Sequence, residues 1–143
     1  MQRREVKAIL FDMDGVLVDS LDTWCYTFND TLKYFGLKTI PRNVFIKDFG
    51  APIEHDVRKY FKGKTIKEVE HVYNSKFKDR IRYVKLFPES ISVLKKLKKY
   101  PIKIGLITNS TRFITSTILN HFKLKKYFKV IVTMDDVKKR KPA

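Results

Sequence analysis

The chain has 143 residues, with 31 Lys and Arg against 15 Asp and Glu, so its formal net charge is +16. Hydrophobic residues make up 43% of it and Gly and Pro contribute only five residues each, which excludes collagen-like, low-complexity and generally disordered chains. No apolar run approaches the roughly 18 residues of a membrane span, and the single Cys25 cannot close an intrachain disulfide. These features predict a globular, cytoplasmic protein of one domain, or of one domain with a small insertion.

Positive charge is concentrated in the last third of the chain. Residues 87–143 carry 14 basic and three acidic side chains. Four of the lysines, Lys95, Lys96, Lys98 and Lys99, interleave with leucines at helical spacing, which is typical of a solvated helix face. We therefore expect these lysines to form a solvated surface. The alternative is that their positive electrostatic potential attracts acidic substrates or polyanions.

The first predicted element is a strand over residues 6–11. This nearly continuous apolar run ends at Asp12, as in strands that are buried on both faces of a parallel sheet. Apolar residues then recur at three- and four-residue steps from Leu21 to Phe35, and Gly36 follows as a stop signal. The second segment predicts an amphipathic helix.

Two more helices are predicted in the next part of the chain. Pro52 suits a first helical position, with acidic residues in the turn that follows. Thr65 and Glu68 have the spacing of a capping box and open another helix. The segment from about residue 20 to about residue 86 is therefore predicted to contain helices and no strands.

After Phe87 and Pro88 the pattern changes to an alternation of helices and strands. The segments are 91–97 (helix), 102–107 (strand), 114–122 (helix) and 128–133 (strand). This alternation predicts an α/β fold with a Rossmann-like, doubly wound parallel sheet. Because the helical segment interrupts that pattern, we predict an α/β core of residues 1–19 and 87–143 with an inserted helical cap at 20–86.

Polar side chains follow each of the three predicted strands. Asp12 and Asp14 follow the first, Thr108 and Asn109 follow the second, and residues 135–141 follow the third. In open parallel sheets, ligands bind at the carboxyl ends of the strands. Carboxylates, a hydroxyl, an amide and a lysine at one sheet edge are the groups that a phosphate site with a hard cation needs.

Three sequence motifs resemble those of the haloacid dehalogenase-like hydrolase superfamily. The segment KAILFDMDGVLVDS resembles its first motif, GLITNS its second, and KKRKPA the lysine motif of the branch that includes phosphoglycolate phosphatases and β-phosphoglucomutases. The order and spacing of the motifs agree, including a helical cap between the first and second. The resemblance spans essentially the whole chain.

The resemblance implies a role for each residue of the motifs. Asp12 would attack phosphorus and become an aspartyl phosphate, and Asp14 would be the general acid and then the base. Mg²⁺ would be held by Asp12 and by the main-chain carbonyl of Asp14. Thr108, Asn109 and Lys141 would bind the phosphate. Since dehalogenases lack an aspartate at the position of Asp14, the resemblance favours phosphoryl chemistry.

Physical reasoning adds expectations for three of these residues. Asp14 must be protonated when substrate binds, so we expect a partly desolvated position near Asp12 to raise its pKa. The alternative for Thr108 is plain N-capping of the next helix by the segment 108–111. Lys141 is chosen over Lys138 and Lys139 because Pro142 follows it, as in the family pattern.

Two residues of the predicted cap are further candidates for contact with substrate. Gly50 resembles the cap loop that contacts substrate in this branch, and Arg58 lies near enough in sequence to meet an anionic leaving group. The alternative is an ordinary solvated basic face.

The sequence departs from the family pattern after the lysine motif. Family members continue with a helix and a strand that ends in acidic residues, one of which completes the Mg²⁺ shell. The resemblance therefore implies a chain truncated before the fourth motif. It also implies that the first strand, central in the family, is left as a bare sheet edge.

The leading hypothesis is a Mg²⁺-dependent phosphatase that hydrolyses a small phosphorylated metabolite. A sugar-phosphate mutase of the β-phosphoglucomutase kind shares the motifs and is the second hypothesis. The third is an inactive basic module that binds polyanions or a partner protein. Because the sequence shows no evident aromatic platform for stacking, it argues against a nucleic-acid partner, and it gives no membrane partner.

Overall fold

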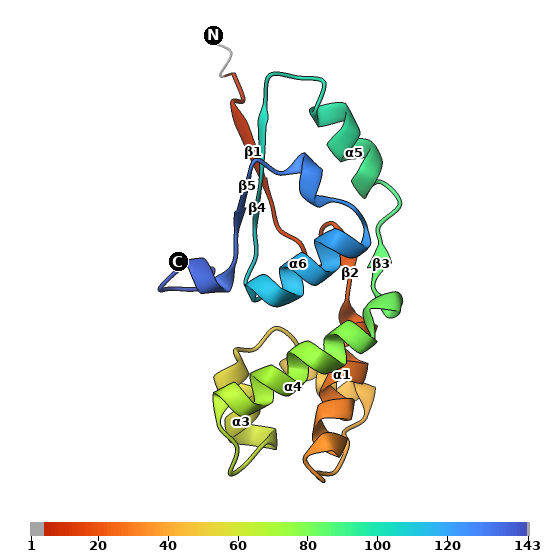
Figure 1. Cartoon of the computed structure of the whole chain (residues 1–143), viewed down its shortest axis with the longest axis vertical. Coiled ribbons are helices and arrows are strands. Elements are labelled where there is room, and N and C mark those ends of the chain that lie inside the picture. Colours follow the sequence, from red (N-terminus) through yellow and green to blue (C-terminus); the bar gives the residue numbers. More distant parts are fainter. Residues whose placement is uncertain (1–4, 143) are drawn as a thin grey trace. The chain divides into compact units, whose positions relative to one another are not determined.

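The computed structural model describes residues 5–142 and divides them into two compact units (Figure 1). The core unit holds the described residues of 1–19 and 85–143, and the helical unit is Ser20–Val84. None of the described helices is long and apolar enough to cross a membrane.

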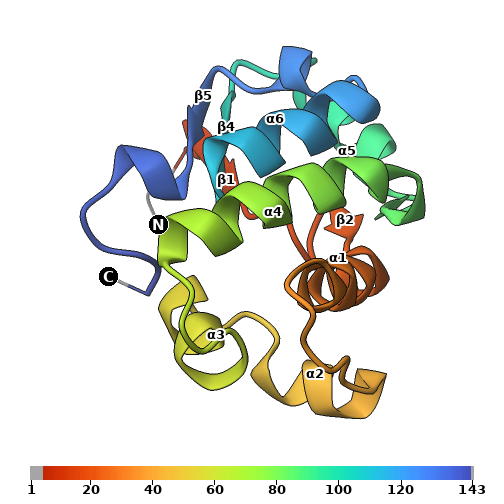
Figure 2. The ribbon, with the colours of Figure 1, turned by 60° about the horizontal axis from the view of Figure 1, so that its bottom comes forward.

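The core unit is built on a parallel sheet of three strands. They are β1 (Ala8–Phe11), β4 (Lys103–Ile107) and β5 (Val130–Val132), in the order β1-β4-β5. Helix α5 (Ser90–Leu97) leads into β4 and helix α6 (Arg112–His121) joins β4 to β5. The α/β class predicted from the alternation of strands and helices is confirmed. In the described residues both helices lie on the same side of the sheet (Figures 1 and 2).

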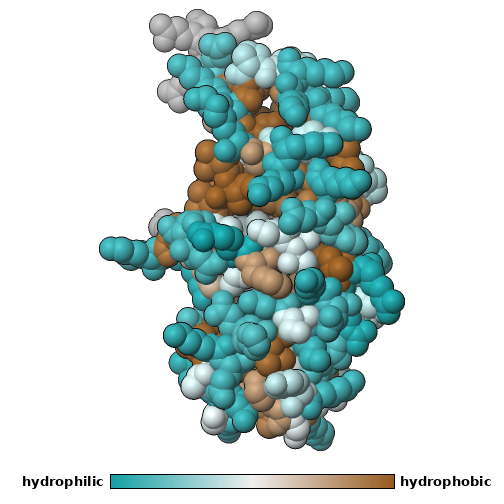
Figure 3. All heavy atoms as spheres, viewed as in Figure 1, coloured by the Kyte–Doolittle hydropathy of each residue, from teal (hydrophilic) through white to brown (hydrophobic). Residues whose placement is uncertain are grey.

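The sheet is covered on one face only by these helices. Ile104 and Leu106 of β4 are buried, whereas Leu10 of β1 is 62% exposed and Val130 of β5 is 56% exposed. Figure 3 shows apolar residues in brown over the strands. The expectation that residues 6–11 form a strand buried on both faces is therefore wrong for the described chain. Burial on the second face needs a second layer, and α5 and α6 supply only one.

A short antiparallel ribbon joins the two stretches of chain that lead to and from the helical unit. Strand β2 (Val18–Asp19) pairs with β3 (Lys85–Leu86). The hydroxyl of Ser90 also donates to the carbonyl of Leu17, at 2.8 Å. Sequence periodicity missed this ribbon because two residues are too few to show alternation.

The helical unit contains four helices and a short 3₁₀ turn. They are α1 (Leu21–Tyr34), α2 (Arg42–Asp48), α3 (Ile53–Tyr60), α4 (Ile66–Asp79) and η1 (Ile81–Tyr83) (Figure 2). Pro52 is the N-cap of α3, one residue before the position predicted for it. Helix α2 was not predicted; with seven residues it offers too few turns for a clear helical period.

The capping box predicted at the start of α4 is confirmed. The hydroxyl of Thr65 accepts from the backbone N–H of Glu68 at 3.2 Å, and the Glu68 carboxylate accepts from the backbone N–H of Thr65 at 2.7 Å. Helices α1 and α4 pack around aromatic side chains. The ring of Phe28 lies 5.1–6.2 Å from the rings of its neighbours Phe45, Tyr60, Phe61 and Tyr73. Rings in such edge and tilted contacts stabilise a core beyond simple burial.

One carboxyl group faces this aromatic core. The hydroxyl of Tyr73 on α4 donates to Oδ2 of Asp56 on α3, at 3.1 Å. Burial raises the pKa of Asp56 to about 6, from an ordinary value of 3.8. The folded state therefore binds this proton more tightly than the unfolded state does, and the contribution of Asp56 to stability falls as the pH rises from about 4 to about 6.

We expect the substitution Asp56→Asn to remove that pH dependence. An amide has no proton to lose, so the free energy of unfolding of the wild type should fall by up to about 3 kcal/mol relative to the variant between pH 4 and 7. Urea unfolding across this range measures the difference. Asp22→Asn, which alters an exposed carboxylate paired with Arg42, is the matched control and should follow the wild type. Parallel pH profiles for the wild type and Asp56→Asn would contradict the assignment.

Candidate active site

Asp12 stands at the carboxyl end of β1, on a tight loop. The backbone N–H of Met13 donates to its Oδ1 at 2.8 Å, and the buried Met13 side chain anchors the loop in the core. Gly15 has a φ of +78°, and its N–H donates to the carbonyl of Val18 at 2.8 Å. Since a positive φ suits glycine, the sequence Asp-Met-Asp-Gly turns back at once and holds both carboxylates at the strand end.

Lys141 connects the ends of two strands. Its Nζ lies 3.1 Å from Oδ1 of Asp12 and donates to the carbonyl of Ile107, the last residue of β4, at 2.8 Å. The side chain of Asp12 is 47% exposed, so its carboxylate contacts the Lys141 ammonium group on one side and solvent on the other. The structure thus brings together two residues that are 129 positions apart in the chain. Lys138 and Lys139, the other lysines of this run, are exposed.

Thr108 is buried where β4 ends. Its N–H donates to the carbonyl of Val132 at 3.0 Å, and its hydroxyl oxygen accepts from the N–H of Ser110 at 3.1 Å. The N-cap of α6 is Thr111, whose hydroxyl accepts from the N–H of Ile114. Thr111 therefore caps the helix, and Thr108 is the residue for which phosphate binding is predicted. A hydroxyl that accepts one hydrogen bond still has its own proton to donate.

The side chain of Asn109 pairs with the main chain of Lys141. Its amide donates to the Lys141 carbonyl at 3.1 Å and accepts from the Lys141 N–H at 2.9 Å. This reciprocal pair fixes the backbone at Lys141 beside the end of β4. Sequence reasoning missed the pair because no local spacing rule links residues that are 32 positions apart. It offered Asn109 only as a phosphate donor, which stays a prediction.

Asp14 also has a partner on the segment that follows β4. The hydroxyl of Ser110 donates to Oδ2 of Asp14 at 3.0 Å, and the carbonyl of Ser110 accepts from the N–H of Met134. Ser110 therefore orients the half-buried Asp14 side chain from the loop that carries Thr108. This contact of Ser110 was not predicted, because a hydroxyl that follows a strand is equally typical of a helix N-cap.

The acidic residues after β5 stabilise the neighbouring loop. This loop includes the 3₁₀ turn η3 (Met134–Asp136). Hydrogen bonds from the N–H and hydroxyl of Thr133 hold the pKa of Asp136 below its usual value, with a further contribution from the Arg112 guanidinium that contacts it. Asp135 accepts from the N–H of Arg112 at 2.7 Å. These contacts tie the start of α6 to the segment that leads to Lys141.

Gly50 and Arg58 belong to the helical unit. Gly50 follows α2 with a φ of +90°, and Arg58 is exposed on α3. Their contact with substrate stays a prediction.

The oxygen donors at the end of β1 fit part of a magnesium site. Among residues 5–142, no three side chains of the His, Cys, Asp and Glu type gather as a metal centre. The exposed carboxylate of Asp12 and the main-chain carbonyl of Asp14 are donors of the hard type that Mg²⁺ prefers. Two such donors leave most of a six-oxygen shell to water and phosphate.

A parallel α/β sheet with carboxylates, a hydroxyl and a lysine at the carboxyl ends of its strands is the arrangement expected of a phosphate-binding class of protein. Comparison with known proteins agrees with that class. The family model described as haloacid dehalogenase-like hydrolase matches residues 9–143. The chain belongs to this family.

Relatives in this family carry phosphatase names. The chain is 33% identical over 141 residues to a protein of Caldanaerobacter subterraneus named "Putative pyrophosphatase PpaX" and 29% identical over 139 residues to a phosphoglycolate phosphatase of Aquifex aeolicus. Each match covers 96% of this chain, and the chain spans 63% and 65% of the length of these two relatives.

A solved structure shows the same fold. CbbY from Rhodobacter sphaeroides, in complex with phosphate, matches with a TM-score of 0.86 at 20% identity. The match covers 97% of this chain and 68% of that one.

Proposed function

We propose that the full-length protein is a Mg²⁺-dependent phosphatase that hydrolyses a small phosphomonoester through an aspartyl phosphate on Asp12. The observation that carries the proposal is the convergence at one sheet edge of Asp12, Asp14, Thr108 and Lys141, linked by the contacts described above. Membership of a hydrolase family whose relatives are named phosphatases supports it.

Asp12 supplies the nucleophile. Its Oδ1 accepts from Met13 and contacts Lys141, which leaves Oδ2 as the oxygen that attacks phosphorus. The new Oδ2–P bond forms as the ester P–O bond breaks, so one displacement is divided into two in-line steps. Lys141 balances charge beside the transferred group, and the Thr108 hydroxyl donates to a phosphate oxygen.

Asp14 moves the protons. In the first step it gives a proton to the leaving alkoxide, and in the second it takes one from the water that attacks the phosphorus of the aspartyl phosphate. The second attack breaks the Oδ2–P bond, regenerates the Asp12 carboxylate and releases inorganic phosphate. The hydrogen bond from Ser110 holds Asp14 in place for both transfers.

The bound cation would be held by Asp12 and the Asp14 carbonyl, together with water and substrate oxygens. When bound, Mg²⁺ supplies positive charge that reduces the repulsion between a carboxylate and a phosphate dianion.

We expect the full-length protein to release inorganic phosphate from one or a few members of a panel of phosphorylated metabolites. The panel includes phosphoglycolate and pyrophosphate, because relatives are named for them. Removal of Mg²⁺ with EDTA should lower turnover by at least about 100-fold, since the charge it supplies is worth several kcal/mol. Restoring Mg²⁺ is the control. Full turnover in EDTA would contradict the metal dependence.

Product analysis of the same panel distinguishes the phosphatase from the sugar-phosphate mutase. A phosphatase yields free phosphate, whereas a mutase yields an isomerised sugar phosphate. The names of the relatives favour the phosphatase.

A further inference from the structure

A long stretch of the core unit carries no carboxylate at all. Residues 90–134 contain no Asp or Glu, although the whole chain has 15 in 143 residues. The same stretch contains ten basic residues, which are Lys95, Lys96, Lys98, Lys99, Lys103, Arg112, Lys123, Lys125, Lys126 and Lys129. A merely solvated surface mixes both signs of charge, so this imbalance needs its own explanation.

The sheet places two of these lysines, Lys103 and Lys129, beside Lys7 at the amino ends of its strands. The N–H of Lys103 donates to the carbonyl of Lys7 at 3.0 Å, and the N–H of Lys129 donates to the carbonyl of Ile104 at 2.8 Å. Lys7, Lys103 and Lys129 are therefore neighbours across β1, β4 and β5, and all three are exposed. This end of the sheet is opposite to the end that carries Asp12.

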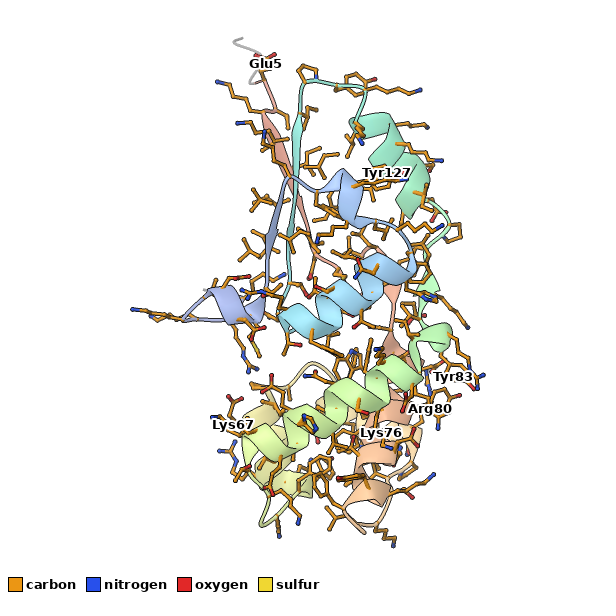
Figure 4. All side chains as sticks on the ribbon, in the orientation of Figure 1. Glu5, Lys67, Lys76, Arg80, Tyr83 and Tyr127 are labelled. Atoms are coloured by element: carbon orange, nitrogen blue, oxygen red, sulfur yellow. The ribbon has the colours of Figure 1, made fainter. Side chains whose placement is uncertain are left out.

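Helix α5 and the 3₁₀ turn η2 (Lys125–Tyr127) extend this positive surface. The ammonium groups of Lys98 and Lys126 each lie 5.5 Å from the centre of the Tyr127 ring. Figure 4 shows Tyr127 where η2 meets α5. The Tyr127 ring therefore lies between Lys98, at the C-terminal end of α5, and Lys126 of η2. We define the basic edge as Lys7, Lys95, Lys96, Lys98, Lys99, Lys103, Lys125, Lys126 and Lys129.

In the part of the chain that the structure describes, no carboxylate forms an ion pair with a lysine of the basic edge. Among residues 5–142, Glu5 is the acidic residue that lies beside the amino end of β1 (Figure 4). In the helical unit, by contrast, Arg42 pairs with Asp22, Lys59 with Asp48, and Arg80 with Asp30. The basic edge therefore keeps its charge available for an external anion.

An exposed aromatic side chain accompanies the lysines. Tyr100 follows Lys98 and Lys99 and is 62% exposed. Val6, next to Lys7, and Val130, next to Lys129, are also exposed, at 58% and 56%, but they lie just before and in strands of the sheet. Binding to an anionic bilayer instead uses an amphipathic helix with large apolar side chains on one face. Lysines around an exposed ring instead match a chain of phosphates with unpaired bases, which stack on aromatic rings.

We propose that the basic edge binds single-stranded nucleic acid, with its phosphates on the lysines and a base stacked on Tyr100. Since this surface lies at the opposite end of the strands from Asp12, nucleic acid and a small phosphate ester can bind at the same time. The proposal reverses the expectation, drawn from the sequence, that no aromatic platform is present. It does not depend on the proposed phosphatase activity.

The test is fluorescence anisotropy of the full-length protein with a labelled oligothymidylate of about 20 nucleotides, at salt concentrations from about 50 to 200 mM. The triple substitution Lys98→Gln, Lys99→Gln and Lys103→Gln should weaken binding by roughly 100-fold near 100 mM salt. It should also lower the salt slope by about 2, because each lost phosphate contact contributes about 0.7 for a single strand. Thermal unfolding and phosphatase turnover should not change.

The matched control removes three exposed lysines from the helical unit, with Lys38→Gln, Lys47→Gln and Lys67→Gln, and should keep the wild-type affinity. Equal losses in both triple variants would attribute binding to net charge and overturn the proposal, as would no binding by the wild type. Tyr100→Ala should weaken binding by about tenfold, and Tyr100→Phe should restore it. Tighter binding to phosphatidylserine vesicles than to the oligonucleotide would overturn the proposal in favour of a lipid surface.

Discussion

The substitution Asp12→Asn is expected to lower turnover of an aryl phosphate by the full-length protein by at least about 1000-fold. An amide oxygen is a far weaker nucleophile than a carboxylate. The change also removes the negative charge that contacts Lys141 at 3.1 Å and that would contact the cation. Spectrophotometric assay of nitrophenol release measures the loss, and mass spectrometry of the wild type during turnover detects the phosphoryl adduct.

Two controls make this result specific to the nucleophile. The free energy of unfolding of the variant should lie within about 1 kcal/mol of the wild-type value, because Asp12 is exposed and its backbone contacts remain. Asp22→Asn removes a carboxylate from the helical unit and should leave turnover unchanged. Turnover by Asp12→Asn near the wild-type rate, after deamidation is excluded by mass, would refute the assignment.

The substitution Asp14→Asn is expected to slow the first step for substrates with alkoxide leaving groups but not for substrates with nitrophenolate leaving groups. An alkoxide needs a proton as it departs, so the first step with an alkyl phosphate should slow by roughly 100- to 10,000-fold. Nitrophenolate leaves without a proton. We therefore expect a burst of about one nitrophenol per enzyme molecule, followed by slow turnover because no base activates the water.

Rapid mixing with both kinds of substrate measures the two steps. Ser110→Ala keeps the Asp14 carboxyl but removes the hydrogen bond at 3.0 Å, and should give a smaller loss in the same direction. An equal slowing of the first step for alkyl and aryl substrates would show that Asp14 is not the proton donor.

The elements of this fold could be predicted where they are long and locally periodic. The apolar residues of α1 recur at helical spacing over its 14 residues, and α4 begins at a capping box, so both helices could be predicted from the sequence. Strands β2 and β3 could not be predicted, because they exist only through pairing between residues 18–19 and 85–86. The exposure of β1 side chains such as Leu10 could not be predicted either, since an apolar run fits a covered strand equally well; the resemblance implied only that β1 lies at a bare edge.

The candidate site shows a similar division. Asp12, Asp14, Thr108 and Lys141 were found because each follows a strand and matches a motif, and parallel strands end at one edge. The partners of these residues were not found. Asn109 and Ser110 contact Lys141 and Asp14 across the sheet edge, and a contact between distant segments leaves no spacing pattern in the chain.

The pairing of Asn109 with the main chain of Lys141 means that two residues determine the structure at position 141. The path of the backbone is set by the amide of Asn109, which does not depend on which side chain residue 141 carries. The ammonium group adds the hydrogen bond to the carbonyl of Ile107 and the contact with Asp12. A substitution at 141 therefore removes these two contacts and keeps the Asn109 pair, whereas a substitution at 109 removes the pair and keeps the ammonium group.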